Sequence, residues 1–496
     1  MSYTSFAFFL FVAASAAAYF LLPLKIRWAA LLCASIGFYA AADLTCLPVL
    51  LAEAAVSFFG AKLIRGGGDL PDAPKRRKVL LAVLIILIGV LAAVKLVRYI
   101  RPDIPLIMPV GLSYYTFSNI GYILDIYWKR YDAESNPLKY LLFVSFFPHI
   151  LQGPIPRFDR LGHQLFEGHR FEYRRVTFGI QLILYGLFQK LVIADRLGIF
   201  VDAVFDDYQS QYGLVMLAAV FFYAIQLYMD FAGCVNIARG TAQIFGIELE
   251  ENFRQPYFST SVDEFWRRWH ITLGAFFRDY VGMPVSVSKR VKRWSKSVRK
   301  SRGKEAAKHV SSLSAVAVVW LCTGLWHGTG LNYLIWALWQ GGIIAFSIIM
   351  ENRYKAMRNA LHIRSDSRGF HLFQIARTFL LAGIIPRIIT RAPSVGAAFV
   401  IIKHCFANLG LQQFHLGKGL EQYGWSRWHL AIAVTAMLIQ LLISILKERG
   451  VMIRERIASL ALPLRWLLYL MLLYSVVLFG IYGPGFDPKN FVYMGF

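Results

Sequence analysis

Long apolar segments recur along the whole chain, and this feature limits most strongly what the chain can fold into. Each is about 20 residues long, the length that an α-helix needs to cross the hydrocarbon core of a bilayer. Because backbone groups find no water there, only helices and closed barrels can span the core. The sequence lacks the alternating apolar and polar residues of barrel strands. An all-α membrane protein with many spans is therefore expected.

The apolar runs delimit the candidate helices, and several of these are too short to cross a bilayer alone. The candidates are residues 6–22, 28–41, 47–64, 79–96, 105–127, 138–150, 176–200, 214–231, 310–325, 332–350, 373–389, 429–446 and 466–482. We expect about 11 to 13 transmembrane or re-entrant helices in one membrane domain, residues 1–496. The first run has no preceding basic region and no clear cleavage site, which predicts a retained helix and not a signal peptide.

Charge predicts how the chain lies in the membrane. The chain is 57% hydrophobic with a net charge of +24, and the basic residues cluster in a few connections between apolar runs. The positive-inside rule places these connections in the cytosol and both termini outside, in an inner or plasma cell membrane. The connection 201–207 and the region around His327 are expected at or near the outer side. Basic residues beside membrane helices attract lipid headgroups, so the charge does not indicate a nucleic-acid partner.

The densest basic stretch, residues 289–308, holds ten Lys or Arg and one acidic residue. Its composition predicts a solvated cytosolic loop near lipid headgroups. Alternatively, the stretch forms a collar that draws in an anionic phosphorylated donor such as coenzyme A.

Two histidines are the strongest candidates for chemistry. His327 lies in a Leu-Trp-His-Gly run in the short break between two apolar segments, and His270 closes a Trp-Arg-Arg-Trp-His run. An ionisable residue at bilayer depth costs about 2.5 kcal/mol or more, so it marks a candidate functional site. Gly328 and Gly330 would let the backbone approach a ligand closely.

The stretch around His270 is too polar to span a membrane but is rich in aromatic residues. We expect a helix in the cytosolic interface or dipping inward, with Ser261 as its N-cap and Glu264 three positions later. Residues at helical spacing would give it one aromatic and apolar face: Trp266, Trp269, His270, Leu273 and Phe277. An ordinary interfacial aromatic belt would explain the tryptophans equally well, but not the histidine.

A different break is expected near Pro148 and the Gln-Gly-Pro-Ile-Pro run, residues 152–156. These residues stop a helix and free its backbone groups. Such backbone is tolerated at membrane depth only where protein or a water-lined cavity covers it. The pattern predicts a re-entrant segment that lines an internal passage.

The available chemistry favours acyl transfer. A histidine can accept a proton from a hydroxyl near neutral pH, and a thioester is already activated, so one base and a positioned acceptor suffice. The sequence has no Gly-x-Ser-x-Gly elbow, no His-Glu-x-x-His, no other histidines at metal spacing and no Walker loop. The five cysteines show no disulfide or metal pattern, although Cys322 near His327 is an alternative acyl carrier.

Several runs together resemble the membrane-bound O-acyltransferase (MBOAT) superfamily. The similar runs are residues 109–117, 144–148, 152–155, 228–233, 252–280 and 325–336. The branch most similar to the chain is that of the bacterial alginate O-acetylation membrane proteins, followed by the teichoic acid D-alanylation transferases. The chain departs from the family pattern at 234–238, 285–288 and Gln340, which leaves the acceptor and the partner open.

The resemblance implies a tunnel through a core at about residues 105–350, from a cytosolic donor entrance to an acceptor opening on the far side. His327 matches the catalytic histidine and His270 a second polar position that holds donor or acceptor. The supporting or tunnel residues would be Asp230, Trp266, Arg268, Trp269, Trp326 and Asn252. As an alternative role, Asp230 would pair with Arg239 or Arg268.

The resemblance also implies the substrates. The donor would be acetyl-CoA or another acyl thioester, with no permanently bound cofactor and no metal. The acetyl group would pass to an extracytoplasmic esterase-like transferase and on to a secreted or cell-envelope polysaccharide. The alternatives are D-alanyl transfer from a carrier protein to teichoic acid, and proton-coupled transport.

Overall fold

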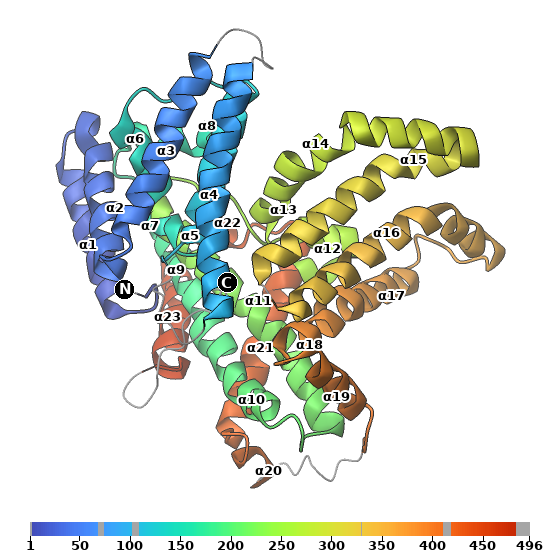
Figure 1. The fold of residues 1–496 in the computed structure, drawn as a ribbon. Helices are drawn as coiled ribbons and strands as arrows, with labels where there is room; N and C mark the ends of the chain where they lie inside the picture. The colour runs from blue at the N-terminus through green and yellow to red at the C-terminus, as the bar shows by residue number, and fades with distance from the viewer. Residues whose placement is uncertain (1, 68–73, 102–108, 329, 410–417, 483–496) are drawn as a thin grey trace. The chain divides into compact units, whose positions relative to one another are not determined.

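A computed structural model describes residues 2–67, 74–101, 109–328, 330–409 and 418–482. Helices and their connections make up this part of the chain, apart from one isolated bridge between Phe253 and Trp269. Ten helical segments in it are long and apolar enough to cross a membrane, and two shorter apolar helices, Phe6–Leu21 and Val395–Cys405, accompany them. The predicted all-α architecture with many spans is confirmed (Figure 1).

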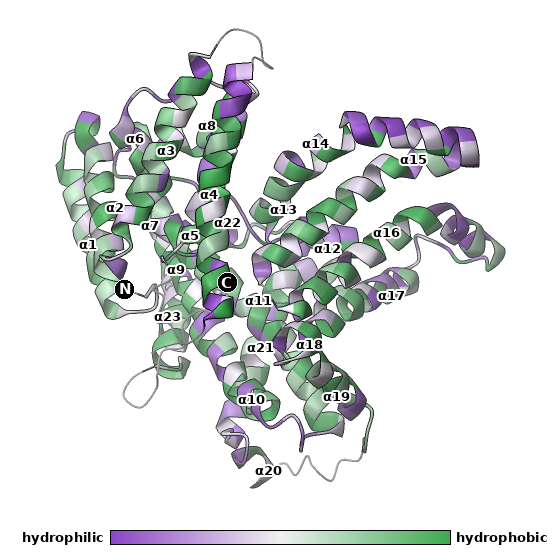
Figure 2. Ribbon diagram, in the orientation of Figure 1, coloured by the Kyte–Doolittle hydropathy of each residue, from purple (hydrophilic) through white to green (hydrophobic). Residues whose placement is uncertain are grey.

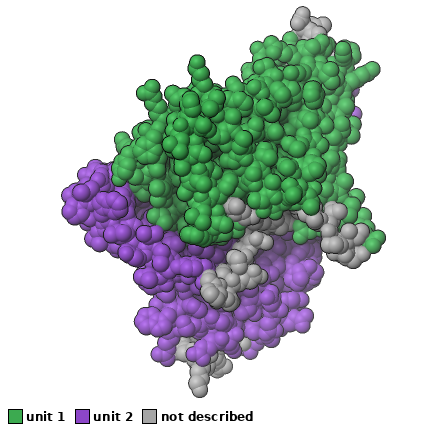
Figure 3. Space-filling view, turned by 90° about the vertical axis from the view of Figure 1, so that its left-hand side faces the viewer, with its two compact units in different colours: residues 1–187, 233–251, 493–495 green, residues 188–232, 252–492, 496 purple. Residues whose placement is uncertain are grey.

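The chain divides into two compact units, which Figure 3 colours separately. The first comprises residues 1–187 and 233–251, and the second comprises residues 188–232 and 252–492. Helix α11 (Gly213–Ile244) runs through both units. The expectation of one membrane domain with a tunnel through residues 105–350 stays a prediction.

The first unit contains the N-terminal helices. They are α1 (Phe6–Leu21), η1 (Leu24–Ile26), α2 (Arg27–Asp43), α3 (Leu47–Arg65), α4 (Pro74–Ile100), α5 (Leu112–Tyr127), α6 (Pro137–Ser145), α7 (Phe147–Ile150), α8 (Phe158–Phe166) and α9 (Tyr173–Leu187). Helix α3 packs against both α4 and α5. Helix α5 begins later than the sequence predicts, and predicted positions 105–108 lie outside the described residues.

The predicted break after Pro148 is present in this unit. Helix α6 ends at Ser145, the short helix α7 follows, and residues 151–156 are buried without forming a helix. Local partners take up some of the backbone groups: the Phe147 N–H donates to Ser35 Oγ (3.1 Å) and the Gly153 N–H to the His149 carbonyl (2.9 Å). That this segment re-enters a membrane stays a prediction.

The second unit contains the remaining helices. They are the π-helical η2 (Phe188–Ala194), α10 (Asp195–Asp206), η3 (Pro256–Phe258), α12 (Val262–Arg268), α13 (Ile271–Phe277), η4 (Arg278–Gly282), α14 (Met283–Ser286), α15 (Lys289–His327), α16 (Leu331–Ala360), α17 (Arg368–Thr378), η5 (Phe379–Ile384), α18 (Ile385–Arg391), α19 (Val395–Cys405), α20 (Lys418–Glu421), α21 (Arg427–Glu448), α22 (Ile453–Ala458) and α23 (Leu462–Phe479). Three of these segments, η2, η4 and η5, are π-helical, a rare local geometry that often marks functional sites.

The basic stretch 289–308 is helical, so the predicted loop is wrong. It is the first part of α15, which turns sharply at Gly303 (φ 87°) and continues as a second helix to His327. Ser295 Oγ donates to the Ala307 carbonyl (3.2 Å), so the two parts run side by side as a basic arm, residues 289–308. The arm is strongly hydrophilic (Figure 2), and all ten of its Lys and Arg residues are exposed. Lys and Arg are good helix formers, whereas the prediction of a loop rested on their charge alone.

Candidate functional site

His327 is the last residue of α15 and is 7% exposed. Close packing of α15 on α16 positions it, because a Cβ on Gly324 would lie 2.7 Å from the Cβ of Ala337. The Trp336 ring of α16 stands 4.8 Å from the His327 ring at 75°. A Cβ on Gly328 would lie 2.3 Å from the Tyr333 ring, so this glycine makes room for a tyrosine rather than for a ligand.

The expected continuous helix around His270 is wrong, because the chain breaks just before this residue. Helix α12 ends at Arg268, Trp269 is extended, and His270 has a positive φ of 46° before α13 begins. A non-glycine residue in this left-handed region is uncommon, and such conformations cluster at functional sites. Ser261 caps α12 as predicted, since its Oγ accepts from the Glu264 N–H (3.1 Å).

Asn252 holds this break in place. Its Oδ1 accepts from the Thr272 N–H (3.0 Å) and from Thr272 Oγ1 (2.7 Å), and its carbonyl accepts from the Ile271 N–H (3.0 Å). The Arg254 N–H donates to the Arg268 carbonyl (3.0 Å) on the other side of the break. These contacts explain why periodicity failed here: a segment earlier in the chain captures the backbone groups that a continuous helix would use.

His270 is 2% exposed and packs against aromatic rings. The Phe231 ring lies 4.8 Å away at 90°, and the Trp326 ring 6.2 Å away. In the described part of the chain, neither ring nitrogen has a hydrogen-bond partner. His270 lies outside the apolar spans, and burial lowers its pKa to about 3, so the ring is neutral at physiological pH. Buried polar groups are almost always paired, so the two ring nitrogens make His270 a candidate contact for a ligand.

The two histidines meet at one aromatic cluster, which we define as His270, His327, Trp266, Trp326 and Trp336. The Trp326 ring contacts both His270 (6.2 Å) and His327 (4.7 Å). Trp266 joins from α12, with its ring 5.6 Å from that of Trp336. Residues that are far apart in the sequence thus surround the two imidazoles. The described residues place no polar partner on the Trp336 Nε1 either.

Trp269 packs on a second aromatic group. Its ring lies 5.1 Å from Phe253 and 5.7 Å from Tyr228. The guanidinium of Arg387 lies 4.7 Å from its centroid. Trp269 therefore anchors the break before His270.

Asp230 lies in a buried ion-pair group that the sequence reasoning missed. Its carboxylate lies 2.5 Å from Lys190 Nζ, which also lies 2.9 Å from the carboxylate of Asp195. Lys190 is on the π-helical η2, and the Lys190 and Asp230 side chains are 3% and 1% exposed. The sequence could have indicated this group, because Lys190 and Asp195 both lie within the apolar run 176–200 and charged residues are rare in membrane spans.

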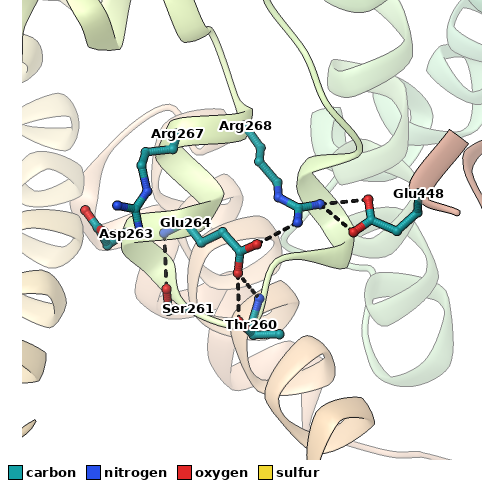
Figure 4. Close-up of polar contacts among 7 residues, drawn as sticks. All are labelled: Thr260, Ser261, Asp263, Glu264, Arg267, Arg268 and Glu448. Atoms are coloured by element: carbon teal, nitrogen blue, oxygen red, sulfur yellow. Dashed lines mark hydrogen bonds and ion pairs between the residues drawn. The ribbon is translucent and has the colours of Figure 1, made fainter. Parts of the chain in front are cut away.

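Arg268 pairs with two glutamates and not with Asp230 (Figure 4). Its guanidinium contacts Glu264 (2.6 Å) on α12 and Glu448 (2.8 Å) at the end of α21. Glu264 also accepts from the N–H (2.8 Å) and Oγ1 (2.7 Å) of Thr260. Arg268 thus fixes α12 to α21, and a direct role for it at a substrate stays a prediction.

Glu264 makes the stability of this region depend on pH. Burial raises its pKa, but the hydrogen bonds from Thr260 and the charge of Arg268 lower it more, and the net shift is downward. Since the folded-state pKa lies below the ordinary value of about 4.3, the stabilisation is present above that value and disappears as the pH falls through the folded pKa.

We therefore expect Glu264→Gln to lower the melting temperature at pH 7 by about 1–3 °C, with a difference from wild type that shrinks below pH 4. Thermal unfolding of both proteins at pH 7 and pH 3 checks this. Glu305→Gln on the exposed basic arm is the matched control and should have no effect. A difference that stays constant over this pH range would refute the ion-pair explanation.

Comparison with known proteins identifies the family. The MBOAT (membrane-bound O-acyltransferase) family model matches residues 129–299, which include Asn252 and His270 and end before His327. The probable alginate O-acetylase AlgI of Pseudomonas fluorescens is 30% identical over 392 residues, which are 79% of this chain and 72% of the relative. The peptidoglycan O-acetyltransferase of Helicobacter pylori is 27% identical, over 79% of this chain and 76% of the relative. The teichoic acid D-alanyltransferase of Bacillus subtilis is 30% identical, over 48% and 59%.

The matched regions cover only 50%, 54% and 52% of three further Pseudomonas proteins named probable alginate O-acetylase. The names of the relatives agree with the resemblance read from the motifs, which is confirmed. The roles of His327 and His270, and of the supporting residues, stay predictions. With its ten apolar helices, the chain is a multi-pass membrane protein that belongs to the membrane-bound O-acyltransferase family, a family of acyl-transferring enzymes.

Proposed function

We propose that this chain passes an acetyl group from a cytosolic thioester, acetyl-CoA, across a cell membrane for the O-acetylation of a secreted or cell-envelope polysaccharide. The observation that carries the proposal is the meeting of His270 and His327 at Trp326, each histidine buried at a break in a helix. The relatives named for O-acetylation of alginate and peptidoglycan support the acetyl group and the polysaccharide class.

In the proposed reaction His327 is the general base. Its imidazole takes the proton of the acceptor hydroxyl, and the hydroxyl oxygen attacks the carbonyl carbon of the thioester. The carbon–sulfur bond then breaks, and the leaving thiolate takes up the proton from the imidazolium. One ester forms, one thioester is lost, and no electron donor or acceptor is needed. The position of His327 as the last residue of α15 suits this role, because the helix ends there and the imidazole lies within the aromatic cluster beside His270.

We assign His270 to substrate positioning. Its neutral ring has one nitrogen that donates a hydrogen bond and one that accepts, and both are buried without a partner among the described residues. A donor carbonyl or an acceptor hydroxyl would satisfy one of them. The edge-to-face packing of Phe231 and Trp326 against this ring would fix its orientation. The Asn252 contacts that hold the break would keep it in place.

The proposed function also requires a particular orientation in the membrane and a partner protein. The basic arm would face the cytosol, in accordance with the positive-inside rule, and would attract the phosphates of coenzyme A. The ester formed on the outer side would go to an extracytoplasmic esterase-like transferase, which places it on the polysaccharide. Both termini would lie outside, and the residues after Tyr482 lie beyond the described part of the chain.

A second candidate is D-alanyl transfer from a carrier protein. The match to the teichoic acid D-alanyltransferase of Bacillus subtilis favours it, and the exposed basic arm would suit an acidic carrier domain. The match covers less of the chain than those to the two O-acetylating relatives, so acetyl transfer is preferred.

Donor preference tests the proposal. The purified protein in nanodiscs is given radiolabelled acetyl-CoA or radiolabelled D-alanyl carrier protein, and label transfer and thiol release are measured. We expect thiol release and transfer from acetyl-CoA. Preferential use of the D-alanyl carrier would replace the first candidate with the second. If neither donor is used in the presence of polysaccharide and a membrane extract, while proton flux appears in proteoliposomes, the chain is a transporter.

A further inference from the structure

A buried arginine outside the aromatic cluster has free hydrogen-bond donors. Arg387 lies on α18 and is 2% exposed. Its Nε and Nη2 are buried and have no hydrogen-bond partner in the described part of the chain. Its guanidinium carbon lies 4.7 Å from the centroid of the Trp269 ring, which supplies no oxygen acceptor to these two nitrogens.

Three other arginines of the described chain each have an oxygen partner. Arg391, one helical turn later on the same helix, pairs with Asp202 (3.1 Å) and Asp206 (3.4 Å). The buried Arg27 and Arg76 both donate to backbone carbonyls. A buried cation without an anion is strongly unfavourable, because it has lost its hydration. Its retention at Arg387 therefore calls for an explanation.

Two structural explanations fail. An arginine that snorkelled to lipid phosphates would expose its guanidinium, whereas Arg387 is almost fully buried. The contact with Trp269 attracts the positive charge, but it gives Nε and Nη2 no oxygen acceptor. A planar guanidinium edge matches the two oxygens of a carboxylate or a phosphate. The missing partner therefore has the chemistry of an anionic oxygen group.

The start of α18 is tied to the aromatic cluster. The π-helical η5 precedes it, and the freed carbonyls of Leu381 and Ala382 accept from Trp339 Nε1 (2.9 Å) and Gln340 Nε2 (3.4 Å). Gln340 Oε1 in turn accepts from Trp266 Nε1 (3.1 Å). On the other side, the Trp269 that covers Arg387 is the residue before His270. The guanidinium is thus fixed beside the turn that carries one of the two histidines.

We propose that Arg387 binds the carboxylate or phosphate of a substrate while that substrate reacts at His270 and His327. The inference rests on the proposed function, since it assigns the anionic group to the acetyl donor or to the acceptor. Two sources share this chemistry: the phosphates of acetyl-CoA and the carboxylate of a sugar acid in the acceptor. Arg387 would act in binding and positioning, and takes no part in proton transfer.

Paired charged and uncharged substrates distinguish the two sources. KM and kcat are measured, with a membrane extract that supplies the partner transferase, for acetyl-CoA against acetyl-pantetheine, which lacks the nucleotide phosphates, and for a sugar-acid oligosaccharide against its methyl ester. Arg387→Gln is compared with Arg387→Lys and with Arg391→Gln, the matched control on the same helix. We expect Arg387→Gln to raise KM by about 10- to 100-fold for one charged substrate and little for its uncharged analogue. Arg387→Lys should recover part of this loss, and Arg391→Gln should show no such preference.

A binding measurement without turnover separates this inference from the proposed function. The melting temperatures of wild type and of Arg387→Gln are measured with and without coenzyme A, and with and without the oligosaccharide. We expect one of the two anions to stabilise wild type but not the variant, even if acetyl transfer itself were absent. The ligand-free variant should be at least as stable as wild type, because it loses an unpaired buried charge.

Two results would overturn the inference. In one, Arg387→Gln changes KM equally for charged and uncharged substrates and the binding of neither anion depends on Arg387. In the other, the ligand-free variant melts well below Arg391→Gln while anion binding is retained, which would show a structural role.

Discussion

Replacing His327 with alanine is expected to reduce acetyl transfer by about 100- to 10,000-fold, the usual contribution of a general base. We expect the variant to fold, because His327 is the last residue of α15, where its ring makes an edge-to-face contact with Trp336. KM for acetyl-CoA should change little, since the imidazole acts on the proton of the acceptor. Initial rates of thiol release and label transfer check this.

The matched control for this variant is His371→Ala, which removes an exposed histidine from α17. It should leave the rate and the melting temperature unchanged. His270→Ala provides a second comparison and should raise KM more than it lowers kcat, as a positioning role requires. If His327→Ala retains full activity and folds normally, the base lies elsewhere and the assignment of His327 is wrong.

The second large effect is expected at Lys190. Its ammonium lies between the carboxylates of Asp195 (2.9 Å) and Asp230 (2.5 Å), and all three side chains are buried. Lys190→Met would remove the cation that contacts both buried carboxylates, so we expect a loss of about 3–5 kcal/mol in stability. Thermal or denaturant unfolding in detergent measures this.

A variant in which all three side chains of this ion-pair group are neutral tests whether charge causes the loss of stability. The triple variant Lys190→Met, Asp195→Asn, Asp230→Asn has no uncompensated charge and should recover much of the lost stability. Asp207→Asn changes an exposed carboxylate just beyond α10, whose contacts are with Ser210 and Gln211 at the surface, and should cost far less stability. Asp230→Asn separates structure from function: a stable but inactive variant would show that Asp230 also serves the reaction.

The membrane-spanning helices could be predicted from the sequence, because the length of an apolar run determines whether a helix can cross the bilayer and does not depend on tertiary contacts. Positions 6–22 and 47–64 of the sequence correspond to α1 and α3 within a residue at each end. Helix α19 was missed, since its eleven residues are too few to stand out as a span. The loop predicted at the basic arm followed from its high charge. The helix propensity of its Lys and Arg residues instead favours the helix that the structure has there.

The site was only partly predictable. Both histidines were found from the sequence, but their meeting at Trp326 depends on packing between segments that periodicity does not describe. The left-handed turn at His270 is imposed by Asn252, which lies 18 positions earlier. Lys190 and Arg387 were overlooked because a window average of hydropathy hides a single charge among apolar neighbours. In a membrane chain, each charge inside an apolar run merits individual inspection.

The uninterrupted helix from Lys304 to His327 joins the basic arm to the histidine at its far end. At 1.5 Å per residue it forms a rod about 35 Å long. The second part of the arm and His327 therefore belong to one continuous helix. Under the proposed function, a nucleotide or carrier domain bound at the arm would be tied by the backbone of this single helix to the histidine at its other end.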